Sequence, residues 1–251
     1  MNQDGCARLE RYLPQARVNI FELYAATVAR YMNGKPHQTI VDVGGGKSCP
    51  FSGYRRPGTQ TKIIAVDVSA EELADNEDVD EKRVANIMEH LPFEDGEVDI
   101  VVSRSVLEHL ENLDLFVTEA ARVLKKDGYF IHLFPSKFAP FSAINQLVPN
   151  KVAKRLLYSL HPNAKGICGF PAYYNKCFYS AIKSLLHKNG YEIVESHVSY
   201  YQASYFKFFV PFFLLIALYE IAVRFLGVKN LGAYLLIIAQ KKTDSTEMLS
   251  R

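Results

Sequence analysis

The stretch from Thr39 to Ser48, TIVDVGGGKS, constrains the fold of this chain more than any other. Its apolar run ends in three consecutive glycines, which indicates a buried strand followed by a turn where the backbone closely approaches another group. About twenty residues later a second apolar run, IIAV, ends in Asp67. Glycines admit a ligand to the backbone and a carboxylate accepts from ribose hydroxyls, so the pair predicts a site for a ribose-bearing cofactor.

The glycine turn lacks the G-x-G-x-x-G pattern of a dinucleotide site. Counting from Gly44 and Gly46 puts Cys49 where the third glycine belongs, and Pro50 follows it. This departure disfavours a nicotinamide-dependent oxidoreductase, which is kept as the weaker alternative.

Four further blocks follow in order: NIMEHLPF, EDGEVDIVVS, SVLEHL and ARVLKKDGYFIHLFPS. With VDVGGGKS and IIAVDVS they resemble the motifs of class I S-adenosylmethionine-dependent methyltransferases, in the small-molecule, type 11-like branch. The resemblance covers residues 38–137 and identifies an enzyme whose cofactor is S-adenosyl-L-methionine. It implies an α/β fold with a Rossmann-like seven-stranded sheet, mostly parallel with the last strand antiparallel, and helices on both faces.

The resemblance also assigns cofactor contacts. The glycine backbone would approach the methionine and ribose part with Asp42 nearby, Asp67 would hold the ribose hydroxyls, and Asn86 would meet the adenine amino group where many relatives carry an aspartate. The full expected set is Asp42, Gly44, Gly45, Gly46, Asp67, Val68, Asn86, Ile87 and Ser103. In relatives a leading helix packs over the cofactor, so Tyr12, Arg17 and Tyr24 are further candidates, with packing against the sheet as the alternative.

Apolar periodicity predicts a single domain over residues 1–251, with a helical lead-in (1–37) before the cofactor-binding core (38–137). Helices are expected over 113–125, capped by Asn112, and over 176–188, capped by Asn175. The expected strands are 39–43, 62–67, 82–86, 98–103, 128–134, 191–200 and a final one at 231–240.

His109, in SVLEHL, is the candidate general base, because an imidazole titrates near neutral pH. Its alternative role is to cap or orient the turn between strand and helix. A lid insertion over 138–175 would cover the acceptor, with Tyr173, Tyr174 and His161 as candidate substrate contacts and ordinary packing as the alternative for the tyrosines.

Residues 206–226, FKFFVPFFLLIALYEIAVRFL, form the most unusual stretch. They lie in an apolar helical insertion (204–229) that precedes the final strand. A spanning helix needs about twenty apolar residues, and the charge-free core here is shorter. Peripheral docking on a membrane, packing against a second copy or the core, and a true span all stay open, with docking favoured.

The formal net charge of +2 gives no signal for nucleic-acid binding. The spacing of His161, Cys168 and Cys177 fits no common zinc pattern, so no metal is expected. The free thiols indicate a cytoplasmic protein, and peripheral contact with the inner face of the membrane is a further expectation.

The expected reaction is methyl transfer to a hydroxyl of a lipid or lipid-linked glycan, an acceptor inferred from the aromatic insertion and the apolar segment. An inactive methyltransferase-like binding module is the main rival, and a homodimer stays open.

Overall fold

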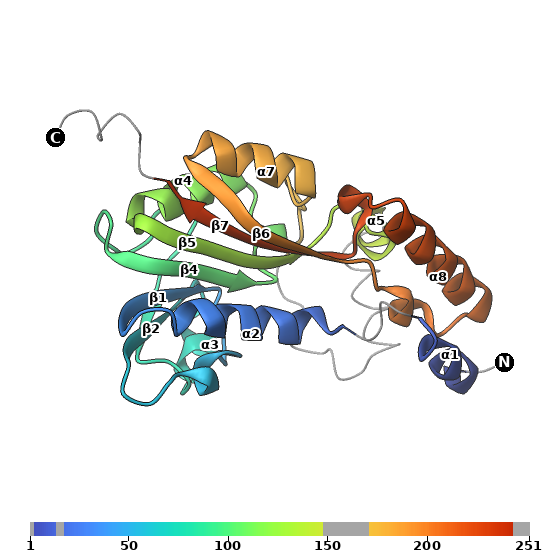
Figure 1. Cartoon of the computed structure of the whole chain (residues 1–251), viewed down its shortest axis with the longest axis horizontal. Helices are drawn as coiled ribbons and strands as arrows, with labels where there is room; N and C mark the ends of the chain where they lie inside the picture. The colour runs from blue at the N-terminus through green and yellow to red at the C-terminus, as the bar shows by residue number, and fades with distance from the viewer. Residues whose placement is uncertain (1–2, 14–17, 148–170, 243–251) are drawn as a thin grey trace.

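A computed structural model describes residues 3–13, 18–147 and 171–242 of the chain. Within these residues the centre is a seven-stranded sheet in the order β3-β2-β1-β4-β5-β7-β6 (Figure 1). Neighbouring strands from β3 to β5 pair parallel, while β7 pairs antiparallel with both β5 and β6. The strands are β1 (His37–Val43), β2 (Gln60–Asp67), β3 (Glu81–Val84), β4 (Val98–Arg104), β5 (Leu124–Pro135), β6 (Tyr191–Ser199) and β7 (Tyr234–Lys241). This Rossmann-like sheet, with its antiparallel last strand, confirms the predicted fold class.

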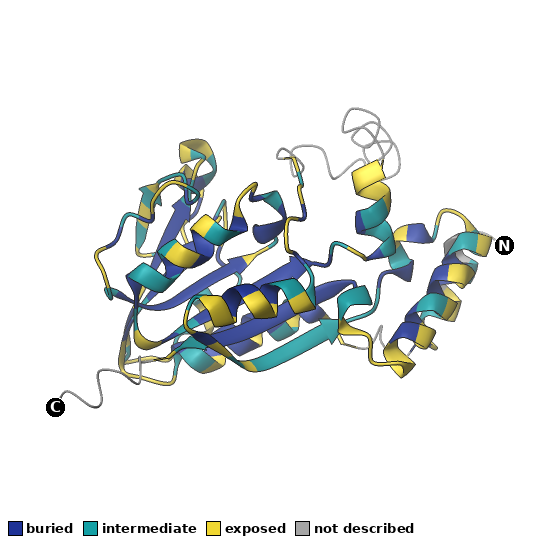
Figure 2. Ribbon diagram, turned by 90° about the horizontal axis from the view of Figure 1, so that it is seen from above, coloured by how far each residue is buried: buried dark blue, intermediate teal, exposed yellow. Residues whose placement is uncertain are grey.

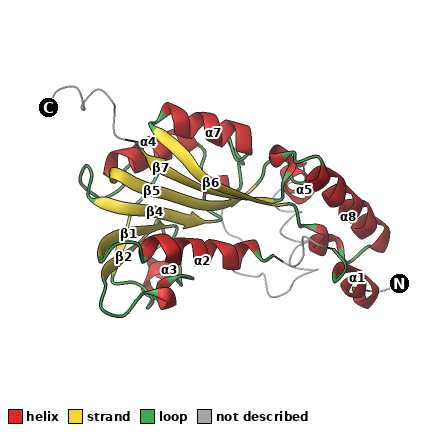
Figure 3. Cartoon of the chain, viewed as in Figure 1, coloured by secondary structure: helices red, strands yellow, loops and turns green. Residues whose placement is uncertain are grey.

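Helices cover both faces of the sheet (Figures 1 and 3). Apolar side chains of α2 pack on one face, and those of α4 and α7 pack on the other. The helices are α1 (Gln3–Glu10), α2 (Ile20–Met32), α3 (Ala70–Ala74), α4 (Leu113–Val123), α5 (Pro140–Leu147), α7 (Tyr179–Lys188) and α8 (Val210–Phe225). Four short 3₁₀ turns join them: η2 (Ser52–Tyr54), η3 (Leu107–His109), η5 (Ala203–Phe206) and η6 (Lys229–Leu231).

Several predicted boundaries are wrong, including the start of β5, which begins at Leu124 and not at residue 128. The helix expected from residue 176 begins at Tyr179, because Lys176 has a φ of 57° and breaks the helical path. Asn175 does not cap it, and its side-chain amide instead donates to the carbonyl of Glu111 at 2.8 Å. The final strand begins at Tyr234, because Leu231 ends the turn η6.

The predicted cap of α4 is confirmed, because the side-chain oxygen of Asn112 accepts from the backbone N–H of Leu115. The helix ends at Val123, two residues before the predicted boundary, since Leu124 already belongs to β5. One apolar stripe of α4 is buried against the sheet, which is the arrangement its periodicity predicts.

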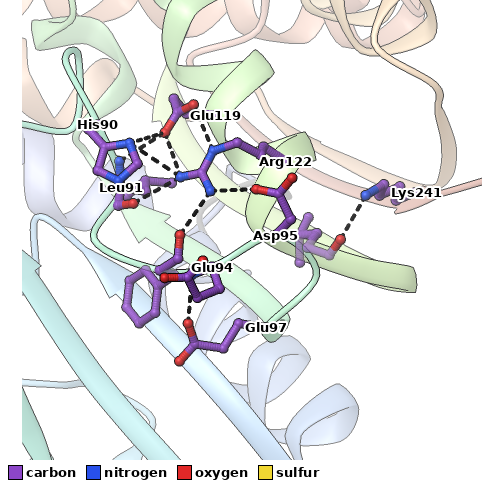
Figure 4. Close-up of polar contacts among 10 residues, drawn as sticks. His90, Leu91, Glu94, Asp95, Glu97, Glu119, Arg122 and Lys241 are labelled. Atoms are coloured by element: carbon purple, nitrogen blue, oxygen red, sulfur yellow. Dashed lines mark hydrogen bonds and ion pairs between the residues drawn. The ribbon is translucent and has the colours of Figure 1, made fainter.

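Arg122 on α4 ties the loop between β3 and β4 to that helix (Figure 4). Its guanidinium donates to Asp95 at 2.8 Å, to Glu119 at 2.9 and 3.0 Å, and to the carbonyls of Phe93 at 2.9 Å and Leu91 at 3.0 Å. The hydrogen bonds to Glu119 and Asp95 raise the pKa of Arg122 above its ordinary value. The network therefore fixes the loop that leads from the adenine-side residues into β4.

α8 lies at the rim where the parallel strands end. The segment that contains it joins the end of β6 to the start of β7, and Tyr234 at that start pairs with Pro135 at the end of β5. In the figures α8 lies beside α1, beyond the body of the sheet (Figures 1 and 3). Its buried side, which includes Phe213 and Ile216, packs with α1 and η5 in a separate small core.

Candidate active site

The glycine turn lies directly after β1, at the rim where the parallel strands end. Gly44 and Gly46 have φ values of 66° and 42°, in the left-handed region that favours glycine. A Cβ atom on Gly44 would lie 2.4 Å from Cγ2 of Val106, and one on Gly45 would lie 2.7 Å from Cβ of Ala65. The turn therefore excludes side chains and presents bare backbone at the rim.

Asp67 and Asn76 hold this turn from the side of β2. The Asp67 carboxylate accepts from the backbone N–H of Gly46 at 3.1 Å and from that of Ser69 at 2.9 Å. The side-chain amide of Asn76, which is fully buried, donates to the carbonyls of Gly45 and Gly46, both at 3.0 Å. The Asp67 carboxylate therefore lies at the glycine turn. Asn76 was not predicted, because the run ADNEDVD has no periodicity that distinguishes this residue.

Asp42 is buried beneath the turn beside two other polar side chains. Only 4% of Asp42 is exposed, and burial raises the pKa of its carboxyl to about 7 even though the nearby Arg104 guanidinium acts in the opposite direction. The Tyr24 hydroxyl, on α2, is buried without a hydrogen-bond partner, and burial and the Asp42 charge raise its pKa well above the ordinary value. Burial also raises the pKa of the adjacent Cys49 thiol to about 12.

Of the other lead-in candidates, Tyr12 is 81% exposed and Arg17 lies outside the described residues. The lead-in therefore contributes Tyr24, from the middle of α2, to the rim.

The adenine-side candidates lie after β3. The Asn86 side-chain oxygen accepts from the backbone N–H of Met88 at 3.1 Å, and its amide donates to Glu89 at 2.8 Å. Ile87 is buried in the core, and Val68, after β2, is 55% exposed. An oxygen that already accepts one bond keeps a second lone pair, so Asn86 can still accept from an amino group.

Ser103 does not reach the rim with its side chain. Its fully buried hydroxyl lies 2.6 Å from Nδ1 of His132, which packs against Phe130 with ring centroids 3.6 Å apart. Successive side chains of a strand alternate between faces, so Ser103 points into the core while its neighbour Arg104 faces Asp42. The Ser103 side chain is thus turned away from the rim, and the prediction that Ser103 contacts the cofactor stays open only for its backbone.

The Glu108–His109 pair lies in η3, after β4. Nδ1 of His109 is 2.9 Å from the carbonyl oxygen of Pro171, which only accepts, so Nδ1 carries the proton and Nε2 is the basic atom of the neutral ring. Nε2 is 3.9 Å from Oε1 of Glu108. Glu108 is 5% exposed, its Oε2 has no hydrogen-bond partner, and burial raises its pKa to about 8. Sequence reasoning selected His109 and passed over the more perturbed neighbour.

The lid tyrosines meet this pair through the backbone. The N–H groups of Tyr173 and Tyr174 donate to the Glu108 carbonyl at 2.7 and 3.0 Å. Tyr174 is buried and its hydroxyl accepts from Asn145 at 3.2 Å, whereas Tyr173 is 36% exposed. His161 and Cys168 lie outside the described residues.

An aromatic group lies near Glu108, between η5, α5 and the start of β7. Tyr205 and Tyr234 join their hydroxyls at 2.7 Å, and Phe141 stacks on both rings with centroid distances of 4.9 and 5.5 Å. Burial is the main cause of the raised pKa values of Tyr174 and Tyr234, and the nearby Glu108 carboxylate adds to both. The rim thus has a glycine-and-acid side and an aromatic side, with Glu108 near the second.

Comparison with known proteins shows which family model the cofactor-binding part of the chain matches. Residues 41–132 match the family model described as a methyltransferase domain. This finding confirms the family resemblance drawn from the sequence motifs, and with it the S-adenosylmethionine cofactor of that family.

Individual curated relatives match only part of this chain. The chain is 32% identical over 124 residues to a malonyl-[acyl-carrier protein] O-methyltransferase from Geobacter sulfurreducens, a match that covers 44% of this chain and 46% of the relative. It is 30% identical over 118 residues to an uncharacterized protein from Methanocaldococcus jannaschii, covering 47% and 49%. The chain therefore spans about half the length of the curated relatives it matches.

Solved structures share the fold. Geranyl diphosphate C-methyltransferase from Streptomyces coelicolor, in complex with S-adenosyl-L-homocysteine, is 16% identical with a TM-score of 0.57, covering 88% of this chain and 79% of that one. The [4+2]-cyclase SpnF is 18% identical with a TM-score of 0.56, covering 87% and 80%. At such identity the likeness establishes the methyltransferase fold and nothing about substrate.

The residues of this methyltransferase domain fit S-adenosylmethionine on the evidence of the rim itself. The Asp42 carboxyl and the Tyr24 hydroxyl are buried polar groups next to the place expected for a cationic ligand, and the Tyr24 hydroxyl has no hydrogen-bond partner, which is costly. An α-amino group or sulfonium supplies the positive charge that a buried carboxylate needs. The glycine turn has no side chains, so a ligand can lie close to its backbone, and Asp67 offers acceptor oxygens for ribose hydroxyls.

Proposed function

We propose that this protein transfers a methyl group from S-adenosylmethionine to a hydroxyl of a lipid or lipid-linked glycan. The observation that carries the cofactor half is the buried Asp42 carboxyl beside the partnerless Tyr24 hydroxyl, at a turn that excludes side chains. The relative named as an O-methyltransferase supports oxygen as the acceptor atom. The aromatic group around Tyr205 and Tyr234 supports an acceptor with an apolar part.

When bound, S-adenosylmethionine supplies a methyl group on a positively charged sulfur, so the donor is already activated. The chain has to bind and orient it, exclude water and receive a proton from the acceptor. Gly44–Gly46 and Asp67 would hold the ribose side, while Asp42 and Tyr24 would hold the amino-acid side. Positioning of this kind contributes roughly 7–11 kcal/mol to catalysis in favourable cases.

Glu108 and His109 are the proposed proton acceptors on the aromatic side of the rim. His109 was the predicted base, and the basic Nε2 of its ring lies 3.9 Å from Glu108 Oε1. Oε2 of Glu108 is buried without a partner, so an acceptor hydroxyl is a suitable donor to it. At 3.9 Å the two groups are too far apart for a direct hydrogen bond, so each is proposed separately as the residue that takes the proton.

Calorimetric titration with S-adenosyl-L-homocysteine tests the cofactor half. Micromolar binding is expected for wild type, weakened tenfold or more by Asp67→Ala, which corresponds to about 1.4 kcal/mol or more. Asp75→Ala is the matched control, since Asp75 lies close by in the chain but is 62% exposed and pairs with Lys47. NAD serves as the control ligand for the oxidoreductase alternative.

Lack of S-adenosyl-L-homocysteine binding by folded wild type would contradict the proposal and favour the binding-module alternative. The acceptor half is tested separately, by supplying radiolabelled S-adenosylmethionine with a membrane lipid extract or with water-soluble glycans. Label in the organic phase, lost in Glu108→Gln but retained in Asp75→Ala, is the expected result. Label confined to the glycan sample would refute the lipid acceptor while leaving methyl transfer intact.

A further inference from the structure

α8 has a second apolar face that the described structure leaves exposed. Four of its residues are spaced i, i+4, i+7 and i+11, and the fifth directly follows the first, so all five form a single stripe along the helix. This stripe, the outer face of α8, consists of Leu214 (42% exposed), Leu215 (60%), Leu218 (65%), Ile221 (45%) and Phe225 (89%). Exposed residues run along the helix in Figure 2. An exposed apolar stripe of this kind marks an interaction surface.

One exposed cation of α8, Arg224, follows Ile221 at i+3 and directly precedes Phe225, so it borders the outer face. Lys229, after α8, lies over the Tyr179 ring and donates to Tyr179 and Ser196, on the side of α7 and β6. The acid of α8, Glu220, is fully buried, where its carboxylate accepts from the backbone N–H groups of Gln202 and Ala203. The surface therefore pairs an apolar stripe with positive charge.

Glu10 on α1 does not add a free negative charge to this surface. Its carboxylate is paired with Lys207 at 2.5 Å, and only 18% of its side chain is exposed. The pair joins α1 to the segment that leads into α8, so it contributes to packing and adds no net charge to the surface.

The dimensions of α8 suit a helix that lies on a bilayer. Its 16 residues extend about 24 Å, shorter than the hydrocarbon core of about 30 Å. Within the described ranges, no helix combines the length and hydropathy that crossing a membrane requires. Exposed phenylalanines lie at both ends of the stripe, with Phe208 and Phe209 before it and Phe225 at its end. Aromatic rings are favoured at the depth where headgroups meet acyl chains.

We propose that the outer face of α8 docks in the surface of an anionic lipid bilayer. A second copy of the chain is a poorer occupant, because a two-fold contact through this face would add a second Arg224 to the interface, and the acid of α8, Glu220, is buried and offers it no partner. The proposal rests on the proposed function in one respect only: docking would place the rim, where α8 lies, next to the source of a lipid acceptor. Docking itself does not depend on methyl transfer.

Co-sedimentation of the full chain with vesicles tests the proposal. The vesicles contain phosphatidylcholine and phosphatidylglycerol at about 3:1, with pure phosphatidylcholine as the neutral comparison. Leu218→Asp should lower the vesicle-bound fraction about tenfold, because it puts a carboxylate in the middle of the stripe. Leu115→Asp is the matched control, since Leu115 is 50% exposed on another helix, α4, and this variant should bind like wild type.

Arg224→Glu should lower binding to the anionic vesicles and leave the weaker binding to neutral vesicles unchanged. Wild type that stays in the supernatant with anionic vesicles would overturn the proposal, as would Leu218→Asp that binds like wild type. Equal wild-type binding to both vesicle types would overturn its anionic part. A dimer in sedimentation velocity that Leu218→Asp dissociates, without vesicle binding, would assign the face to a second copy instead. S-adenosyl-L-homocysteine titration of each variant shows that it is folded and keeps this result separate from the cofactor test.

Discussion

Replacing Asp42 with asparagine should make the ligand-free protein more stable while weakening its cofactor affinity. The carboxyl is 4% exposed and its pKa is about 7, because burial disfavours the charged form. An asparagine of the same shape removes the charge, and with it the cost of holding an ionised carboxylate in a buried site. The same substitution removes the anion that fits the cationic part of S-adenosylmethionine.

The size of the effect follows from the difference between the folded and unfolded pKa. An unfolded aspartate titrates near 3.9, so the shift of about three units corresponds to about 4 kcal/mol above pH 7. Between these values the folded state keeps a proton that the unfolded state has lost, so the stability of wild type falls as pH rises through this window. Asp42→Asn carries no such proton, and its advantage should grow by about 3 kcal/mol from pH 5 to pH 8.

Urea unfolding followed by circular dichroism at pH 5, 6, 7 and 8 measures this difference, which corresponds to about 6–12 °C in Tm for a chain of this size. Glu108 also has a raised pKa, but it titrates in both proteins and cancels from the comparison. Asp75→Asn, at a side chain 62% exposed, should show no such pH-dependent gain. A gap between Asp42→Asn and wild type that does not change with pH would refute the reasoning, and undiminished S-adenosyl-L-homocysteine binding would refute the cofactor role.

Four further predictions concern the turn, its loop and the acceptor side. Gly45→Ala should cost about 1–3 kcal/mol of unfolding free energy, because its Cβ would lie 2.7 Å from that of Ala65, whereas Gly53→Ala, which meets nothing within 4 Å, should be near neutral in urea unfolding. Asn76→Asp should cost about 2–4 kcal/mol and weaken S-adenosyl-L-homocysteine binding, since a carboxylate would face two carbonyls; unchanged calorimetry would contradict this. Arg122→Met should cost about 2–4 kcal/mol by leaving Glu119 and two carbonyls without their donor, which the urea midpoint reports. With lipid extract as acceptor, kcat/KM should rise until pH passes about 8, as Glu108 loses its proton, and Glu108→Gln should abolish this rise; an unaltered pH profile would exclude Glu108 as the base.

The raised pKa values at the rim indicate that the site is built at a cost in stability. Asp42 lies near the end of β1, and Glu108 lies in η3, after the adjacent parallel strand β4. Both side chains are at least nine-tenths buried, and in both burial is the main cause of the raised pKa. Buried atoms without a hydrogen-bond partner, such as Glu108 Oε2 and the Tyr24 hydroxyl, are expected where a ligand completes the site. In the proposed function, Asp42 belongs to the side that binds the methyl donor and Glu108 to the side that receives the acceptor.

Much of the fold could be predicted because its signals are local. The run TIVDV, the glycines after it and Asp67 indicate strands and turns within short windows, and alternation along the chain then gives a parallel sheet. The antiparallel last strand also agreed, since it came with the family resemblance. Errors arose where one residue's backbone decides a boundary, as at Lys176, whose positive φ delays α7 beyond its predicted cap.

The sequence by itself determined the strand pattern, the glycine turn and the acid that holds it, because each depends on neighbours within a few residues. Only the tertiary structure decided that Ser103 turns into the core, that Asn76 clamps the turn from 30 residues away, and that Glu108 is buried without a partner. It also decided which face of an almost wholly apolar α8 is packed and which is exposed. Burial, and with it a side chain's pKa and its available partners, depends on which distant segments meet, and no local pattern records that.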